Sequence, residues 1–189
     1  MRFAGFVLAG GESRRMGRDK GLLPYLGEPL AGFLARTVSQ VTDSVHIIAD
    51  PSRYGHLGYP VVPDAVAPCG PAGGIYTALL QNRAEWNLVV ACDMPQIDPN
   101  VLWALVQHAA MGGGDCIVPL GPDGQPEPLC AIYHSRCLPA LKQAISDKRL
   151  RMKDLVAEMH PILVAGTAAA CFANVNTPAD LRQLEDQAT

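Results

Sequence analysis

A glycine-rich segment near the N-terminus has the residue types that bind phosphate groups. It reads LAGGESRRMGRDK from Leu8 to Lys20. Gly10 and Gly11 allow the main chain to come close to a ligand, so that backbone N–H groups can bind phosphate oxygens. Arg15 can grip phosphate with a bidentate guanidinium, and Lys20 adds a compact positive charge. The segment predicts a site for the β and γ groups of a triphosphate, with an ordinary turn and a solvated basic surface as the alternative.

The segment differs from the two best-known phosphate-binding loops. A P-loop would need a lysine directly after its last glycine, whereas Gly17 is followed by Arg18. The dinucleotide pattern G-x-G-x-x-G is absent from the segment. The sequence therefore indicates a loop of another class.

A second chemical signal is an aspartate that follows a buried strand. The apolar run from Leu88 to Ala91 is followed by the letters CDMP, in which Asp93 is the aspartate. A carboxylate at the carboxyl end of a parallel strand faces the same edge of the sheet as the glycine-rich loop. Mg²⁺ usually takes one or two protein carboxylates and fills its other positions with water and phosphate oxygens. We expect Asp93 to hold Mg²⁺, with Mn²⁺ as a substitute, and turn or helix capping is the alternative role.

Short apolar runs alternate with amphipathic segments along the first two thirds of the chain, which is typical of βαβ units. Strands are expected at 3–8, 45–49, 88–91, 116–119 and 128–133, with two short ones at 162–164 and 171–173. Helices are expected at 31–38, 72–81, 99–110 and 137–145, and after Thr177. The predicted fold is α/β, a Rossmann-like doubly wound, mostly parallel sheet with helices on both faces.

The composition is that of one globular domain covering 1–189. The chain has 49% hydrophobic and 17% charged residues, far from the composition of a disordered protein. A net charge of −3 and a pI of about 5.9 argue against nucleic acid or an anionic membrane as partner. The six cysteines form no C-x-x-C pair, and no segment has the length of a transmembrane helix. We expect a cytoplasmic protein with reduced thiols.

The string from Leu8 to Lys20 resembles, at every defined position, the L-A-G-G-x-S-x-R-M-G-x-D-K signature of the molybdenum cofactor guanylyltransferases. Related molybdopterin cytidylyltransferases look like L-A-A-G-x-S-x-R-x-G, with alanine where this chain has Gly10, so the resemblance favours guanine over cytosine. It implies a fold like that of the nucleotide-diphospho-sugar transferases, and Asp93 matches the family's metal-binding aspartate. It divides the chain into a nucleotide-binding part, about 1–110, and an acceptor-binding part, about 111–189.

The resemblance also implies further nucleotide contacts. Asp64 matches an aspartate that ends a short strand, where it would accept from guanine N–H groups or from ribose hydroxyls. Gly73 and Gly74 match small residues that open a helix beside the nucleoside. Asp50 is the nearest counterpart of a family asparagine, although an aspartate cannot donate a hydrogen bond at neutral pH. The implied nucleotide site is Leu8, Ala9, Gly10, Gly11, Lys20, Asp50, Asp64, Gly73, Gly74 and Asp93.

The acceptor site rests on two weaker similarities. The segment FANVNTPADL resembles the family ending F-x-N-x-N-T-P-x-D-L, in which Asn174 and Asn176 would point to one face. Thr177, with Asp180 three residues later, would in any case cap the last helix. Gln125 and Pro126 resemble part of the family's Q-P-L segment, with a two-residue difference.

Taken together, the resemblance implies that the chain transfers GMP from GTP to the phosphate of molybdopterin and releases pyrophosphate. Arg15, Lys20 and Asp93 would be its catalytic residues, acting by orientation and charge neutralisation without a covalent intermediate. The alternatives are a CTP-dependent molybdopterin cytidylyltransferase, a transferase for another cofactor or sugar phosphate, and a non-catalytic nucleotide-binding carrier. Expected partners are GTP, molybdopterin and, transiently, molybdoenzymes or cofactor-assembly proteins, with no nucleic acid and no membrane.

Overall fold

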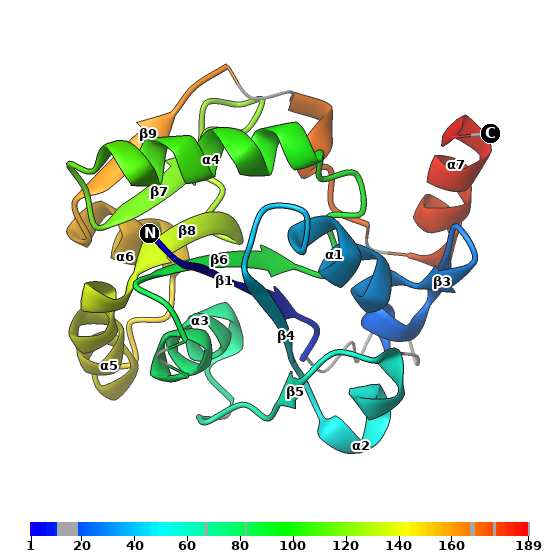
Figure 1. Cartoon of the computed structure of the whole chain (residues 1–189), viewed down its shortest axis with the longest axis horizontal. Coiled ribbons are helices and arrows are strands. Elements are labelled where there is room, and N and C mark those ends of the chain that lie inside the picture. The colour runs from blue at the N-terminus through cyan, green and yellow to red at the C-terminus, as the bar shows by residue number, and fades with distance from the viewer. Residues whose placement is uncertain (11–18, 67, 82, 167–168, 176, 189) are drawn as a thin grey trace.

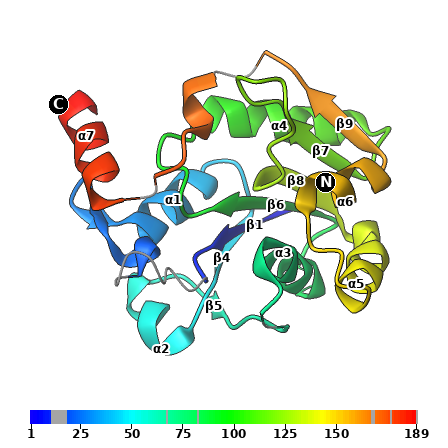
Figure 2. The ribbon, with the colours of Figure 1, turned by 180° about the vertical axis from the view of Figure 1, so that it is seen from behind.

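A central strand, β1 (Phe3–Leu8), organises the fold in the computed structural model (Figures 1 and 2). The structure describes residues 1–10, 19–66, 68–81, 83–166, 169–175 and 177–188. Every residue of β1 is buried, because its side chains alternate between two cores. Phe3 and Val7 belong to the core on one face of the sheet, and Ala4 and Phe6 to the core on the other. This double burial explains why the strand is a continuous apolar run.

Within the described ranges, seven strands form one sheet. In spatial order they are β5 (Val61–Val62), β4 (Ser44–Ile48), β1, β6 (Trp86–Ala91), β8 (Cys130–His134), β7 (Cys116–Pro119) and β9 (Pro161–Val164). β8 is antiparallel to both of its neighbours, and the remaining pairs are parallel. The predicted mostly parallel, doubly wound sheet is confirmed. A separate short hairpin joins β2 (Pro24–Tyr25) to β3 (Glu28–Pro29).

Helices cover both faces of the sheet (Figure 1). The helices on one face are α1 (Leu30–Val38) and α4 (Pro99–Met111), and those on the other are α3 (Gly70–Leu80), α5 (Leu138–Ser146) and α6 (Met152–Glu158). The short α2 (Pro51–Tyr54) follows β4, and α7 (Pro178–Ala188) lies against the hairpin. Single 3₁₀ turns occur at η1 (Lys20–Leu22), η2 (Gly55–Leu57), η3 (Ser135–Cys137) and η4 (Ala169–Phe172).

The predicted start of the last helix is confirmed in detail. The Thr177 hydroxyl accepts from the Asp180 N–H at 3.2 Å, and the Asp180 carboxylate accepts from the Thr177 N–H at 2.8 Å. These reciprocal bonds form a capping box, which satisfies backbone donors that the first turn of a helix leaves without partners.

The strand expected at 171–173 is wrong, because the chain forms the 3₁₀ turn η4 there. Cys171 and Phe172 are consecutive, and both are buried in the same core. A strand would send neighbouring side chains to opposite faces, so a turn is the conformation that buries this pair together. Helix α6 was not expected from the sequence either.

The parallel strands bring their carboxyl ends to one edge of the sheet. Leu8 of β1 pairs in register with Ile48 of β4 and with Ala91 of β6. The segments that follow these residues therefore leave the sheet side by side, where open α/β sheets bind their ligands. None of the helices in the described ranges has the length and hydropathy needed to cross a membrane.

Candidate active site

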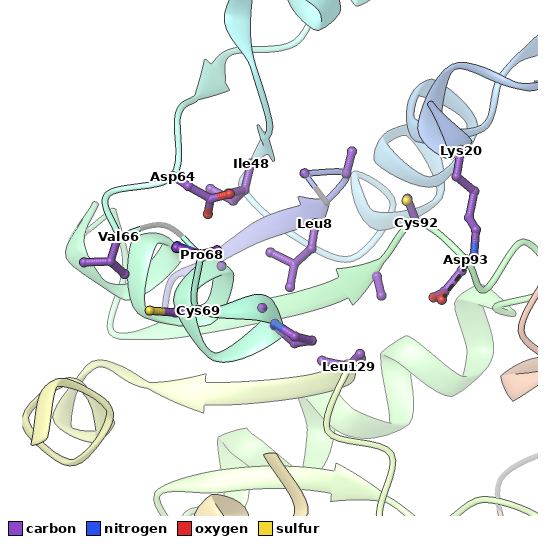
Figure 3. Close-up of a pocket in the computed structure, with 16 residues that line it drawn as sticks. Leu8, Lys20, Ile48, Asp64, Val66, Pro68, Cys69, Cys92, Asp93 and Leu129 are labelled. Atoms are coloured by element: carbon purple, nitrogen blue, oxygen red, sulfur yellow. Dashed lines mark ion pairs between the residues drawn. The ribbon is translucent and has the colours of Figure 1, made fainter. Parts of the chain in front are cut away.

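A cavity of about 530 Å³ lies at this carboxyl edge (Figure 3). The last residues of β1, β4 and β6 line it, together with the segments after β1, β5 and β6, the first turn of α3 and the residue before β8. Its lining residues are Leu8, Ala9, Gly10, Lys20, Ile48, Asp64, Val66, Pro68, Cys69, Gly70, Pro71, Gly74, Ala91, Cys92, Asp93 and Leu129. Figure 3 shows Lys20 and Asp93 at one end and Asp64, Val66 and Cys69 at the other. The cavity has the volume of a small-molecule site.

The two residues with the strongest predicted chemistry meet in this cavity. The Lys20 ammonium lies 3.6 Å from Asp93 Oδ2, and the two side chains are only 15% and 29% exposed. The cause is the strand register: the Cys92 N–H donates to the Leu8 carbonyl at 3.0 Å, which places Asp93 beside the end of β1. The Asp93 carboxylate and the described ends of the glycine-rich segment, Leu8 to Gly10 and Lys20, are thus on the same edge, as the sequence predicts.

Asp93 has the electrostatic character of a cation ligand. Its Oδ1 is buried and has no hydrogen-bond partner among the described residues, while Oδ2 faces the lysine. A buried carboxylate oxygen without a donor is costly, so it favours a bound cation or proton. The described residues include no cluster of three or more histidine, cysteine, aspartate or glutamate side chains. Mg²⁺ held by one carboxylate and by substrate phosphates does not need such a cluster, so Asp93 could hold it.

Gly10 and Asp64 lie close together in the site. The Gly10 N–H donates to the Ile48 carbonyl at 2.9 Å, which ties the chain to the end of β4. A Cβ at Gly10 would lie 3.0 Å from Asp64 Oδ2, closer than most contacts that a Cβ makes. Partial burial of the Asp64 carboxyl raises its pKa above the usual aspartate value, against the lowering effect of a hydrogen bond with Thr77.

The two predicted glycines of α3 have different surroundings. Gly74 lines the cavity, and a Cβ there would lie 3.1 Å from the Leu8 side chain. A Cβ at Gly73 would lie 3.0 Å from the Val66 carbonyl oxygen and from Cys69 Cβ. Gly74 therefore lets α3 approach β1, whereas Gly73 lets the preceding segment pack on the helix.

Asp50 lies beside the main cavity rather than in it. Its Oδ1 caps α2, since it accepts from the Ser52 N–H at 2.9 Å and from the Ser52 hydroxyl at 2.8 Å. These hydrogen bonds lower the pKa of the Asp50 carboxyl. Asp50 borders an adjoining cavity of about 380 Å³, which also contacts Gly10 and Asp64. This capping role was not predicted from the sequence.

The expected acceptor residues are only partly brought to the site. Asn174 is exposed and precedes Val175, whose N–H donates to the Asp93 carbonyl at 2.8 Å. Gln125 and Pro126 lie in the turn before β8 and do not line the cavity. The predictions for Gly11, Arg15 and Asn176 lie outside the described residues.

Several lining residues were missed by the sequence analysis. Ile48 and Leu129 belong to apolar runs and carry no chemical signal of their own, although the end of a parallel strand marks Ile48. Cys92 also lines the cavity, and burial raises the pKa of its thiol to about 12. The thiol is therefore protonated at neutral pH and has no reactive thiolate.

A doubly wound sheet with a cavity at the carboxyl ends of its parallel strands has the architecture of the nucleotide-binding α/β proteins. The comparisons with known proteins define the family: the model of the MobA-like NTP transferase domain matches residues 5–162, and the chain belongs to that family. It is 33% identical over 181 residues to a probable molybdenum cofactor guanylyltransferase from Flavobacterium johnsoniae, covering 95% of this chain and 94% of the relative. A relative of the same description from Bacillus subtilis is 32% identical, with 99% and 96% covered.

Solved structures have the same fold. Molybdopterin-guanine dinucleotide biosynthesis protein A from Archaeoglobus fulgidus superposes with a TM-score of 0.82 at 24% identity, covering 98% of each chain. A CMP:2-keto-3-deoxy-manno-octonic acid synthetase in complex with CTP has a TM-score of 0.72 at 13% identity, covering 100% of this chain and 98% of the other. At these identities the likeness establishes the fold alone.

Proposed function

We propose that this protein is a molybdenum cofactor guanylyltransferase, which transfers GMP from GTP to the terminal phosphate of molybdopterin. Its relatives with the same description cover nearly the whole chain. The observation that carries the proposal is the meeting of Lys20 and Asp93, 3.6 Å apart, beside Gly10 at the carboxyl edge. This arrangement offers a positive charge for phosphate and a buried carboxylate oxygen for a cation within one cavity.

The reaction needs no strong base. An oxygen of the acceptor phosphate is already anionic near neutral pH and attacks the α-phosphorus of GTP. The bond from that phosphorus to the bridging oxygen of the β-phosphate breaks, and pyrophosphate leaves with the electron pair. Orientation and charge neutralisation supply the catalysis.

Each residue then has a separate task. Lys20 turns from Asp93 to the β and γ phosphates and stabilises the charge that builds up on the leaving group. Asp93 holds the metal, and bound Mg²⁺ would supply charge neutralisation to the phosphate oxygens. Arg15, which lies outside the described residues, is proposed to assist Lys20. Asp64 and the first turn of α3 bind the nucleoside at the opposite end of the cavity.

The setting of the reaction is also part of the proposal. All six cysteines are free, which suits a reducing compartment, and we place the reaction in the cytoplasm. The product would pass to molybdoenzymes or cofactor-assembly proteins by transient contact.

The test is the nucleotide preference of the purified protein. Pyrophosphate release is measured with molybdopterin and Mg²⁺ and each of GTP, CTP, ATP and UTP in turn. We expect GTP to give the highest kcat/KM. Faster turnover with CTP would assign the chain to the cytidylyltransferases instead, and no pyrophosphate from any nucleotide would favour a non-catalytic carrier.

A further inference from the structure

Tyr54 contacts residues near both ends of the glycine-rich segment, Ala9 and Asp19. The residue ends α2 and is only 1% exposed. Its hydroxyl oxygen lies 3.2 Å from the Ala9 carbonyl oxygen and makes a short hydrogen bond with Asp19 Oδ1. Ala9 follows β1 and Asp19 precedes η1, so one buried side chain joins two positions ten residues apart.

The Asp19 carboxylate is held at both oxygens. Oδ1 accepts from the Tyr54 hydroxyl, while Oδ2 pairs with Arg53 Nη1 at 3.0 Å. The Asp19 side chain is only 9% exposed, whereas Arg53 is 53% exposed. The buried hydroxyl bond is therefore the stronger constraint, because an exposed ion pair contributes little. Burial and the neighbouring Asp19 raise the pKa of Tyr54, so its hydroxyl keeps its proton.

The Tyr54 hydroxyl also packs closely against Gly21. A Cβ at Gly21 would lie 2.5 Å from the Tyr54 hydroxyl oxygen and 3.2 Å from Ala9 Cβ. Gly21 therefore lies close to both Tyr54 and Ala9. Lys20 lies between Asp19 and Gly21, and its backbone position follows from theirs.

We propose that Tyr54 and Asp19 are positioning residues, which fix the backbone of Lys20 relative to Ala9 and Gly10 before the triphosphate binds. Neither lines the main cavity, and both border the adjoining cavity of about 380 Å³, where the Tyr54 hydroxyl bonds to the Asp19 carboxylate. Their effect is to hold the ammonium of Lys20 at a fixed distance from the main chain at Ala9 and Gly10, on the side of the cavity where the polyphosphate would bind. This inference rests on the proposed function and adds two residues to its machinery.

The decisive variant is Tyr54→Phe, which keeps the buried ring and removes only the hydroxyl. We expect the KM for GTP to rise about tenfold, which corresponds to about 1.4 kcal/mol and to the loss of one hydrogen bond to a charged acceptor. The kcat should stay within about twofold, because the bond acts equally in the ground and transition states. A KM within about twofold of the wild-type value would overturn the inference.

Tyr133→Phe is the matched control. Tyr133 is also fully buried, in the core on the opposite face of the sheet from Tyr54, and its hydroxyl donates to the Pro128 carbonyl at 2.7 Å. The two variants remove the same chemical group from a core, so both should lower the melting temperature. Only Tyr54→Phe should raise the KM. An equal rise in both variants would mean that general loss of stability is the cause and would refute the inference.

Variants at Asp19 test the second half of the contact. Asp19→Ala removes the acceptor and should weaken triphosphate binding about tenfold, as Tyr54→Phe does. Asp19→Asn keeps an oxygen that can accept from Tyr54 and should recover most of that loss. Equal losses in the two variants would contradict the role of the hydroxyl bond.

A binding measurement separates this inference from the proposed function. The dissociation constant of inorganic tripolyphosphate with Mg²⁺ is measured by calorimetry for the wild type and for both tyrosine variants. This probe has no base and needs no acceptor, so it reports the phosphate site even if GTP is not the substrate. Weaker binding in Tyr54→Phe than in Tyr133→Phe supports the inference, and equal binding in both overturns it.

Discussion

Replacing Asp93 by asparagine should separate catalysis from stability. The change keeps the size of the side chain and removes its charge. Two unit charges about 4 Å apart attract by about 4 kcal/mol at an effective dielectric constant of 20, and Lys20 lies 3.6 Å from Asp93 Oδ2. The burial of Asp93 Oδ1, which has no hydrogen-bond partner in the described part of the chain, opposes this attraction and costs about 1–3 kcal/mol or more. Desolvation of both charged groups further reduces the net stabilisation that the Lys20–Asp93 pair gives to the fold.

The free energy of unfolding of Asp93→Asn should therefore lie within about 1 kcal/mol of the wild-type value. Turnover should respond differently, because the metal loses its only anionic protein ligand in the proposed mechanism. We expect kcat to fall at least about 100-fold, which corresponds to about 2.7 kcal/mol of transition-state stabilisation. The assays are pyrophosphate release from GTP with molybdopterin and equilibrium unfolding in urea.

Asp98→Asn is the control for this prediction. Asp98 caps α4, where its carboxylate accepts from the Asn100 N–H at 2.8 Å, and it does not line the cavity. Asparagine is an equally good cap, so both stability and turnover should stay close to the wild-type values. The reasoning would be refuted if Asp93→Asn kept near-normal turnover, or if it lost several kcal/mol of stability.

Three further predictions follow from the same cavity. Lys20→Ala should lower kcat/KM for GTP about 10- to 100-fold, since it removes a charged hydrogen bond to phosphate. The control Lys142→Ala, on the exposed face of α5, should leave kcat/KM unchanged. Equal rates in both variants would contradict the role of Lys20. Gly10→Ala should displace the Asp64 carboxylate, because Asp64 Oδ2 lies 3.0 Å from the position of the new Cβ. We expect kcat/KM to fall about tenfold for GTP and less for CTP, which kinetic assays with the two nucleotides would measure. The KM for GTP should rise as pH falls through the raised pKa of Asp64, since the protonated carboxyl loses acceptor capacity, and this rise should begin at a higher pH than for an ordinary aspartate. A pH profile of Asp64→Asn should lack that rise, and an unchanged profile would exclude Asp64 as its source.

The sequence predicts the fold well where a strand is buried on both faces. Every residue of β1 and β6 is buried, and β1 and the part of β6 from Leu88 to Ala91 are continuous apolar runs, so these strands can be predicted without knowledge of their neighbours. The antiparallel direction of β8 was not predicted, because the pairing partner of a short strand is decided by the path of the chain. Helix α6 was missed since its seven residues are too few for a clear helical period.

The candidate site could be predicted where residue type and position at a strand end agree. Lys20 and Asp93 are reactive side chains in segments that follow neighbouring strands, and the register of β1 and β6 brings them together. The contact of Tyr54 with Asp19 could not be predicted, because it joins residues 35 apart through a buried hydroxyl. Asp50 also follows a strand end, but its local hydrogen bonds to Ser52 use it as a helix cap.

The most direct test of the account is a crystal structure of the protein with GTP and Mn²⁺. The anomalous signal locates the metal without reference to any assumed chemistry. We predict a peak about 2 Å from a carboxylate oxygen of Asp93, with the triphosphate along Gly10 and the Lys20 ammonium moved onto its phosphate oxygens. A metal peak away from Asp93, or a triphosphate bound outside the cavity at the carboxyl edge, would contradict the central claim.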